Sequence, residues 1–287
     1  MIFTLVILLH VCILTVDSMV ISPLSNVSGV LKQNDIPLDM ANKSVDDMYR
    51  GCASQMHNKV NNYLNSELKN KTFKNIWTKS EEWTKFKLKY RSNKDLKLDH
   101  FKALYCYTSI KQHFYNNFVT AVRTNGPVYP RGFSYHAIHF LLSDAIRILK
   151  KSQQECFTTN RRTKDTFNVQ GNTEIRFGSF TSNSLQNNLV KYGEQDCFEI
   201  KTCHGANLKC NEVNDQEEVL IPPYDKFKIT AIEHKKNILN CKKLYKLTSS
   251  GTKSNFNCLA VRRANSGGQH LNLKAADVNA IVQPNAF

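Results

Sequence analysis

Apolar residues recur at three- and four-residue steps through the first half of the chain, which is the spacing of amphipathic helices. The pattern is regular from Val45 to Leu68, from Leu98 to Arg123 and from Phe133 to Leu149. Gly126-Pro127 follows the second stretch, and Lys150-Lys151 closes the third, as expected at helix ends. This half of the chain is therefore predicted to be mainly helical.

Near Cys156 the pattern changes to short runs with two-residue alternation, rich in β-branched and aromatic residues. No ten-residue helical pattern separates most of these runs, which disfavours a doubly wound parallel sheet. The expected fold class is α+β, with helices first and a mostly antiparallel β core after them. Six strands are expected, at Cys156–Thr159, Glu174–Thr181, Asp196–Lys201, Glu218–Ile221, Lys226–His234 and Leu244–Leu247.

The chain begins with an apolar run, Met1 to Ser18, that is too short for a comfortable membrane span and is predicted to be a secretory signal peptide. The run lacks the usual basic n-region, so an uncleaved N-terminal anchor is the alternative. Residues 19–40 contain prolines, serines and asparagines without periodicity, which is typical of a flexible leader. Residues 274–287 have no continuous hydrophobic tail that could direct a lipid anchor. We therefore expect a secreted, extracellular protein without a stable membrane span.

The cysteines agree with export. The sequence has nine, and removal of Cys12 with the signal would leave an even set of eight, enough for up to four disulfides. A zinc site is disfavoured because no cysteine or histidine pairs at knuckle spacing supply enough ligands. His136 and His139 lie three residues apart on an expected helix, but no third ligand is near, so no metal site is expected. Asn26, Asn42 and Asn70 begin glycosylation sequons, consistent with a glycoprotein.

Lysine and arginine outnumber aspartate and glutamate by 39 to 24, a net charge of +15. Such an excess attracts acidic surfaces, glycans or phosphates, although it also serves simply as a solvated face. The densest basic region, Lys69 to Lys97, is interleaved with Trp77 and Trp83 and could suggest a nucleic-acid surface. Given the export signal, we prefer the interpretation that the tryptophans pack a helical subdomain while lysines cover its edge. No nucleic-acid partner is expected.

Three polar residues lie on short apolar segments where packing alone would not require them. They are Arg161, Ser182 and Glu218. An arginine, a serine and a glutamate brought together suit a ligand that is anionic at one end and develops positive charge at the other. The alternative is that the arginine and glutamate form surface ion pairs and that Ser182-Asn183-Ser184 is a turn.

These residues and their neighbours resemble the vertebrate ecto-ADP-ribosyltransferase family, the NAD(P)-arginine ADP-ribosyltransferases. Arg161 follows a cysteine by five residues, and the order and spacing of the motifs match from about Val45 to Cys258. The matching segments are Tyr107-Thr108, Phe133–Ala137, Phe180–Ser184, Cys197–Ile200, Glu217–Pro223 and Tyr245–Leu247.

The resemblance implies a split β core of two antiparallel sheets with NAD in the cleft, and no permanently bound cofactor. NADP is an alternative substrate. Arg161 would hold the NAD phosphates, because a planar guanidinium binds them bidentately. Ser182 would orient the glutamate and the nicotinamide ribose, and Glu218 would stabilise the oxocarbenium ion as the glycosidic bond breaks. Tyr107 and Arg162 are also assigned to the NAD site.

The resemblance also implies a single ADP-ribosyltransferase domain at residues 41–265, with a mainly helical part at 41–150 and a β core at 151–265. Residues 266–287 would be a polar tail. Two disulfides follow from the same likeness. Cys156 is expected to pair with Cys203 and Cys52 with Cys258, the latter in preference to Cys241.

Gln216 is the most informative departure from the family pattern. Arginine-modifying members carry a glutamate at this position, two residues before the catalytic one, to hold the acceptor guanidinium. Asn160 replaces a usual aromatic residue, Arg162 stands where many members have glycine, and the loop from Cys210 to Asp215 lacks the usual aromatic.

The expected function is transfer of ADP-ribose from NAD to arginines of extracellular or cell-surface proteins. An amide can accept hydrogen bonds from a guanidinium but cannot neutralise it. Hydrolysis of NAD is therefore a first alternative, and an inactive secreted protein that binds glycans is a second.

Overall fold

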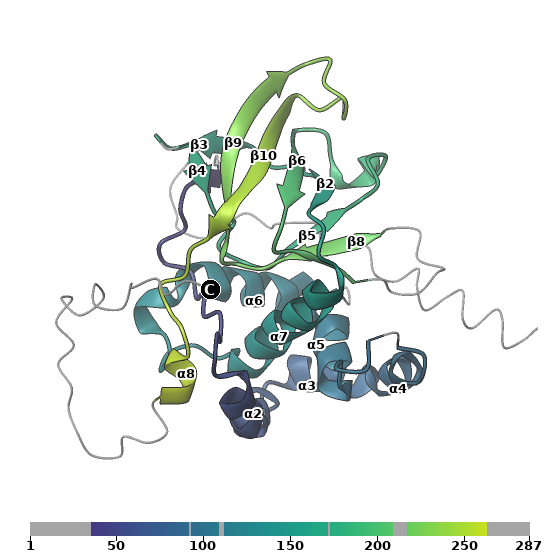
Figure 1. Cartoon of the computed structure of the whole chain (residues 1–287), viewed down its shortest axis with the longest axis vertical. Coiled ribbons are helices and arrows are strands. Elements are labelled where there is room, and N and C mark those ends of the chain that lie inside the picture. Colours follow the sequence, from purple (N-terminus) through teal and green to yellow (C-terminus); the bar gives the residue numbers. More distant parts are fainter. Residues whose placement is uncertain (1–35, 92, 109–111, 172, 209–216, 263–287) are drawn as a thin grey trace, which may run out of the picture.

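The computed structural model describes residues 36–91, 93–108, 112–171, 173–208 and 217–262, arranged as a helical layer beneath a β-sheet (Figure 1). The predicted signal peptide, residues 19–35 of the leader and the C-terminal tail lie outside the described residues. Helices come first in the chain and strands after them, which confirms the α+β fold class. The helices are α2 (Ala53–Glu67), α3 (Lys71–Lys79), α4 (Glu81–Lys89), α5 (Leu98–Thr108), α6 (Gln112–Thr124), α7 (His136–Ser152) and α8 (Leu259–Arg262), with 3-10 turns η2 (Gly126–Val128) and η3 (Val190–Tyr192).

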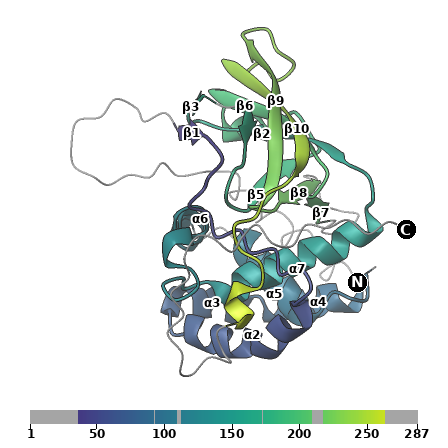
Figure 2. The same ribbon diagram turned by 60° about the vertical axis from the view of Figure 1, so that its left-hand side comes forward.

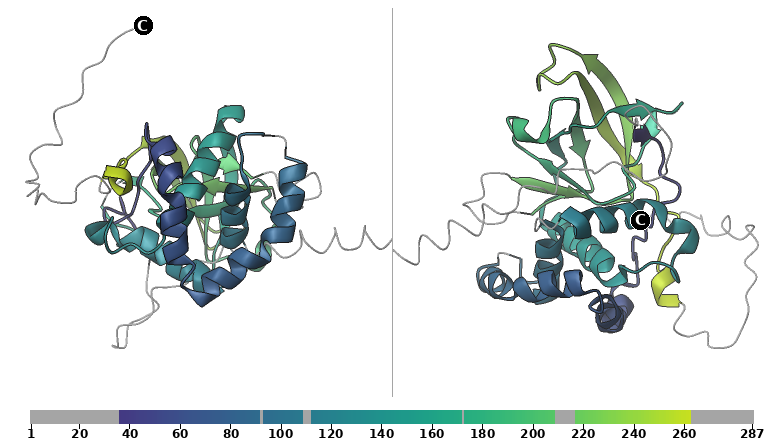
Figure 3. Two further views of the ribbon diagram at one scale, coloured as in Figure 1. Left: turned by 90° about the horizontal axis from the view of Figure 1, so that it is seen from below. Right: turned by 180° about the vertical axis from the view of Figure 1, so that it is seen from behind.

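Helix α7 forms the centre of the helical layer, in contact with α2, α5 and the sheet (Figures 1 and 3). Every residue from His136 to Ile146 is buried, since the helix is covered on several sides. Trp77 is buried in the same core and Trp83 packs against it, as predicted for the basic region. The lysines Lys102 and Lys87 lie over these two rings.

The helix predicted from Val45 to Leu68 begins only at Ala53. The cause is the pair Asp46 and Asp47, whose buried carboxylates hold a distant segment of the chain. Asp46 accepts a hydrogen bond from the backbone N–H of Asn255, at 2.8 Å, and Asp47 from that of Cys258, at 2.7 Å. Because these long-range bonds require an irregular backbone, the apolar spacing overstates the helix at its start. The stretch predicted from Leu98 to Arg123 likewise contains two helices, α5 and α6.

Over the described residues, ten strands form two sheets. An eight-stranded sheet has the order β4-β9-β10-β6-β2-β5-β8-β7, and β1 pairs with β3 in parallel. Within the large sheet only β6 and β10 are parallel, so the core is mostly antiparallel. The strands are β1 (Ile36–Leu38), β2 (Phe157–Arg162), β3 (Phe167–Val169), β4 (Glu174–Ile175), β5 (Thr181–Ser184), β6 (Asp196–Thr202), β7 (Ala206–Asn207), β8 (Glu218–Ile221), β9 (Asp225–His234) and β10 (Lys243–Thr252).

The large sheet is nearly divided between β2 and β5, which share a single residue pair, Asn160 with Ser184. On one side β2 continues into β6, β10, β9 and β4, and on the other β5 continues into β8 and β7. The view in Figure 2 shows the two groups of strands diverging above the helices. This geometry matches the expected split β core.

Three strands were not predicted, and one predicted strand is divided. Residues 36–38, placed in the flexible leader, form β1 against β3. The run from Glu174 to Thr181 becomes β4 and β5 because Gly178 interrupts it with a left-handed backbone, φ +69°. A Cβ at Gly178 would lie 2.3 Å from the Cβ of Ala41, so this close approach requires glycine.

Three disulfides connect the described residues. Cys52 is bonded to Cys258 and Cys156 to Cys203, the two pairs that the family resemblance implied. The third bond, Cys197 to Cys241, was not predicted. Over the described ranges, no helix combines the length and the hydrophobicity that a membrane crossing would require.

Candidate active site

The three residues singled out in the sequence meet at the point where the sheet divides. Arg161 lies on β2, Ser182 on β5 and Glu218 at the first position of β8. Strands β5 and β8 pair so that Ser182 and Glu218 are diagonal neighbours, since Ser184 lies opposite Glu218. The fold therefore brings together residues that are far apart in the sequence.

Ser182 connects the other two. Its hydroxyl Oγ donates a hydrogen bond to Glu218 Oε1 at 2.6 Å, and its backbone carbonyl accepts one from Arg161 Nη1 at 2.7 Å. All three residues are buried, with Arg161 only 1% and Glu218 7% exposed. Buried charges of this kind are held by partners rather than by water, which fixes their orientation before any ligand binds.

Two tyrosines pack beside these three residues. Tyr107 on α5 donates to the carbonyl of Phe180 at 3.0 Å and lies 3.4 Å from Ser182 Oγ. Tyr115 on α6 packs against it, with ring centroids 5.4 Å apart. Burial raises the pKa of both phenols, and nearby Arg161 opposes the shift at Tyr115. Tyr107 was predicted for the site and Tyr115 was not.

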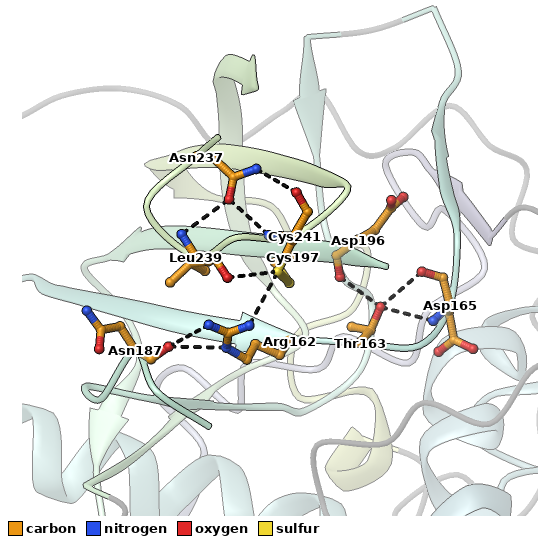
Figure 4. The surroundings of a disulfide bond; sticks show 9 residues. All are labelled: Arg162, Thr163, Asp165, Asn187, Asp196, Cys197, Asn237, Leu239 and Cys241. Carbon is orange, nitrogen blue, oxygen red and sulfur yellow. Dashed lines mark hydrogen bonds between the residues drawn. A yellow bond between two sulfur atoms is a disulfide. The ribbon is translucent and has the colours of Figure 1, made fainter. Parts of the chain in front are cut away.

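Arg162 points elsewhere, although it was assigned to the same site. Consecutive residues of a strand face opposite sides, so Arg162 leaves β2 away from Arg161. Its Nε and Nη2 donate to the carbonyl of Asn187 at 3.1 and 2.9 Å, and Nη1 lies 3.5 Å from Cys241 Sγ (Figure 4). The structure places Arg162 in a structural contact that supports the end of β2.

Gln216, the predicted acceptor-positioning residue, lies outside the described residues, as does most of the loop before Glu218. The description resumes at Glu217, whose backbone is left-handed with φ +40°. Glu217 O accepts the N–H of Leu185 at 3.1 Å, which continues the pairing of β5 and β8 one step beyond Glu218.

The disulfide between Cys156 and Cys203 joins the residue before β2 to the residue after β6. Strand β2 is thereby fixed at one end by this bond and at the other by the contacts of Arg162. Arg161 is presented from a strand that is held at both ends.

Histidines in the helical layer have structural partners. His57 and His100 both contact Asp144 Oδ2, at 2.9 and 3.1 Å, in an arrangement that could suggest a metal site. His100 Nδ1 accepts the backbone N–H of Lys97, so its Nε2 carries the proton and donates to Asp144. A protonated nitrogen cannot bind a metal, and the cluster is better described as a hydrogen-bonded network.

The histidines flagged in the sequence, His136 and His139, contact carbonyl oxygens, of Pro130 at 2.7 Å and of Val45 at 2.9 Å. His139 Nδ1 also lies 2.9 Å from the hydroxyl of Tyr49. Both histidines are therefore engaged within the helical layer rather than facing the site on the sheet.

Comparison with known proteins places this arrangement in a family. The family model for NAD:arginine ADP-ribosyltransferases matches residues 38–253. The erythroblast NAD(P)(+)–arginine ADP-ribosyltransferase of chicken (Gallus gallus) is 32% identical over 236 residues, covering 79% of this chain and 77% of that protein. The T-cell ecto-ADP-ribosyltransferase 1 of mouse (Mus musculus) is 32% identical over 232 residues, covering 77% of each.

Solved structures agree. The eukaryotic mono-ADP-ribosyltransferase ART2.2 superimposes with a TM-score of 0.66 at 30% identity, over 78% of this chain and 99% of that one. A variant of ART2.2 crystallised in complex with NAD superimposes with a TM-score of 0.65. The chain belongs to the NAD:arginine ADP-ribosyltransferase family. It is a mono-ADP-ribosyltransferase, for which NAD is a substrate and not a permanently bound cofactor.

Proposed function

We propose that Arg161, Ser182 and Glu218 carry the reaction. The observation that supports this most directly is the 2.6 Å hydrogen bond from Ser182 to Glu218, beside the Arg161 contact on the same serine. Arg161 binds the NAD phosphates. Tyr107 supports Ser182 through the contact between its hydroxyl and Ser182 Oγ. For Arg162, which the family resemblance assigned to the NAD site, we propose a role in supporting β2, because its guanidinium donates to the carbonyl of Asn187.

The carboxylate of Glu218 acts when charge develops. As the bond between nicotinamide and the ribose breaks, its electron pair leaves with neutral nicotinamide, and the ribose becomes an oxocarbenium ion. Glu218 bonds to the ribose 2′-hydroxyl and stabilises that cation. A guanidinium nitrogen of the acceptor then attacks the anomeric carbon and loses a proton. Water attacking the same carbon gives ADP-ribose.

The acceptors we propose are arginines on extracellular or cell-surface proteins, with the enzyme itself secreted. The three disulfides of the described residues support an oxidising compartment, because such bonds persist outside the cytosol. A secreted form, rather than an anchored one, is the proposal that follows from the expected signal peptide.

Gln216 sets the balance between transfer and hydrolysis in this proposal. A guanidinium opposite a carboxylate gains a charge-assisted bidentate pair, while opposite an amide it gains ordinary hydrogen bonds, a difference of about 1–2 kcal/mol. The wild type is therefore biased several-fold toward hydrolysis. Gln216→Glu should raise the formation of ADP-ribosyl-agmatine by roughly tenfold, with little change in total consumption of NAD.

The measurement is chromatography of ADP-ribose and ADP-ribosyl-agmatine at fixed NAD and agmatine. Total nicotinamide release in the same samples is the internal control for bond cleavage. If the wild type already modifies agmatine as fast as the Gln216→Glu variant, Gln216 does not have this role and Glu217 becomes the candidate.

A further inference from the structure

The β9–β10 hairpin extends beyond the rest of the sheet, on the side away from the helical layer (Figures 1 and 2). Residues 235–242, which join the two strands, are called the hairpin tip below. The tip contains Lys235, Lys236 and Lys242, all exposed, and no acidic residue. Within the described ranges none of these three lysines forms an ion pair, whereas Lys246 on β10 pairs at 2.7 Å with Glu233, which lies just before the tip at the end of β9.

The backbone of the hairpin tip is held in one shape. Asn237 Oδ1 accepts the N–H groups of Leu239 and Cys241, both at 3.2 Å, and its Nδ2 donates to the carbonyl of Cys241 at 2.7 Å. The disulfide from Cys241 to Cys197 fixes the tip to β6 (Figure 4). Leu239 and Cys241 are buried in a small apolar cluster with Cys197.

Ile238 is 61% exposed between two buried neighbours, Asn237 and Leu239. A single exposed apolar residue is ordinary on a protein surface. Here the isoleucine is held outward on a cross-linked loop and is flanked by unpaired lysines. A partner that covered it would gain apolar contact without the cost of ordering the loop.

The position of the hairpin tip is compatible with a partner that also reaches the active site. Five strand spacings separate β9 from β8, which carries Glu218, or about 24 Å across the sheet. A small folded domain is about 30 Å across and can span both points. The same strand β2 that presents Arg161 contacts the tip through Arg162 and Cys241.

Charge decides the class of partner. At a net charge of +15 the enzyme repels basic proteins and attracts acidic ones. Beside the tip, the backbone carbonyl of exposed Glu194 accepts the N–H of Lys242 at 2.9 Å. The other acid next to the tip, Glu233, is paired with Lys246, so Glu194 is set against three tip lysines. Carboxylates on a partner protein would therefore be attracted to the lysines of the hairpin tip. A purely polar glycan would make no apolar contact with Ile238.

We propose that the hairpin tip is a docking site for acidic, arginine-bearing protein acceptors. Its lysines bind carboxylates of the acceptor, and Ile238 contacts an apolar residue between them. The acceptor arginine is thereby tethered near Glu218. This inference rests on the proposed function and names the class of acceptor that the enzyme selects.

The test uses two synthetic peptides, each with a single arginine, a Gly/Ser spacer and a terminal block. A spacer of about twelve residues has a root-mean-square span of about 20 Å, close to the separation required. One block alternates glutamates around a leucine, and the other replaces each glutamate with glutamine. Agmatine serves as an acceptor too small to reach the hairpin tip.

For the wild type we expect the KM of the glutamate peptide to be about tenfold below that of the glutamine peptide. The double variant Lys235→Glu with Lys236→Glu should abolish this preference. The matched control is Lys74→Glu with Lys79→Glu, which changes the charge equally at two exposed positions of α3. The control variant should keep most of the preference for the glutamate peptide. Ile238→Ser should weaken the binding of both peptides about threefold. Activity toward agmatine should be unchanged in every variant.

Equal KM values for the two peptides with wild type would overturn the inference, as would equal loss of preference in the tip variant and the α3 control. Fluorescence anisotropy with dye-labelled peptides measures the same preference without catalysis. Absence of NAD cleavage in all samples would contradict the proposed function, while the anisotropy result would still decide whether the hairpin tip binds acidic peptides.

Discussion

Ser182 performs two tasks with different parts of one residue. Its hydroxyl holds Glu218, and its backbone carbonyl holds Arg161. A side-chain substitution therefore separates the two tasks. This separation is useful because the proposed roles of Glu218 as the catalytic carboxylate and of Arg161 as the phosphate-binding residue would otherwise be tested only by removing each of them.

We expect Ser182→Ala to lower kcat by about 10- to 100-fold, because Glu218 loses the hydrogen bond that orients it. The KM for NAD should change by less than about threefold, since the backbone contact to Arg161 remains. Steady-state release of nicotinamide measures both constants. A rise in KM with an unchanged kcat would mean that Ser182 serves binding rather than orientation of the carboxylate.

Arg161 and Arg162 are adjacent in sequence but should respond differently to substitution. Arg161→Lys should raise the KM for NAD by roughly tenfold, because lysine cannot bind phosphates bidentately. Arg162→Met should leave that KM within about twofold but lower stability by about 1–3 kcal/mol, because the carbonyl of Asn187 loses its donors. Thermal unfolding and NAD titration distinguish the two. A large rise in KM for Arg162→Met would return Arg162 to the NAD site.

Some residues of the candidate site could be assigned from the sequence and others could not. The motifs that carry Ser182 and Glu218 led us to expect these residues close together, and the structure joins them by a hydrogen bond; their roles in the reaction stay a prediction. Tyr115 was not predicted, since it lies in an ordinary helical pattern and reaches Tyr107 only when α5 and α6 pack together. Arg162 shares a motif with Arg161 and was assigned to the same site, but adjacent strand positions face opposite sides of the sheet, and its guanidinium contacts Asn187 and Cys241.

Two helices are joined by a side chain at a helix end. Glu67, the last residue of α2, accepts the backbone N–H groups of Ala137 at 2.7 Å and Ile138 at 3.5 Å, in the first turn of α7. Burial raises the pKa of Glu67 to about 8, and these amide donors act against the shift. Between pH 4.5 and about 8, the carboxyl group of Glu67 is thus more protonated in the folded chain than in the unfolded chain.

Because the folded pKa is the higher one, Glu67 contributes stability that is fully present below its unfolded pKa of about 4.5 and is lost as pH rises toward 8. Wild type should therefore lose about 2–3 kcal/mol more than Glu67→Gln between pH 6 and pH 9. Urea unfolding of both proteins at the two pH values measures the difference. Parallel pH profiles would show that Glu67 is ionised in the folded state throughout.

At the scale of elements, the sequence predicted regular segments and missed those set by distant contacts. The helix expected from Val45 starts late because Asp46 and Asp47 hold the segment around Cys258. Strand β1 has only three residues and depends on β3 for its partner, so no local alternation reveals it. Long hairpin strands such as β9 are predictable because one face is exposed and the pattern alternates.

The whole molecule is held together by bonds between its early and late segments. Cys52 and Cys258 join the start of α2 to the segment after the sheet, across 206 residues of sequence. Arg176 on the sheet side forms a fully buried ion pair with Asp46, at 2.5 Å.

Spacing alone leaves about a hundred ways to pair eight cysteines, so the third disulfide could be defined only from the fold. The other two pairs, Cys52 with Cys258 and Cys156 with Cys203, are those that the family resemblance implies.

The central claim is that Glu218 carries the cleavage of NAD, and its direct test compares wild type with Glu218→Gln. The amide keeps the shape and the contact with Ser182 but removes the charge, which is needed chiefly when the oxocarbenium ion develops. We predict that nicotinamide release falls by more than about a hundredfold while calorimetric binding of NAD stays within about tenfold. If the variant keeps more than about a tenth of wild-type turnover, a loss smaller than about 1.4 kcal/mol, Glu218 is not the catalytic carboxylate.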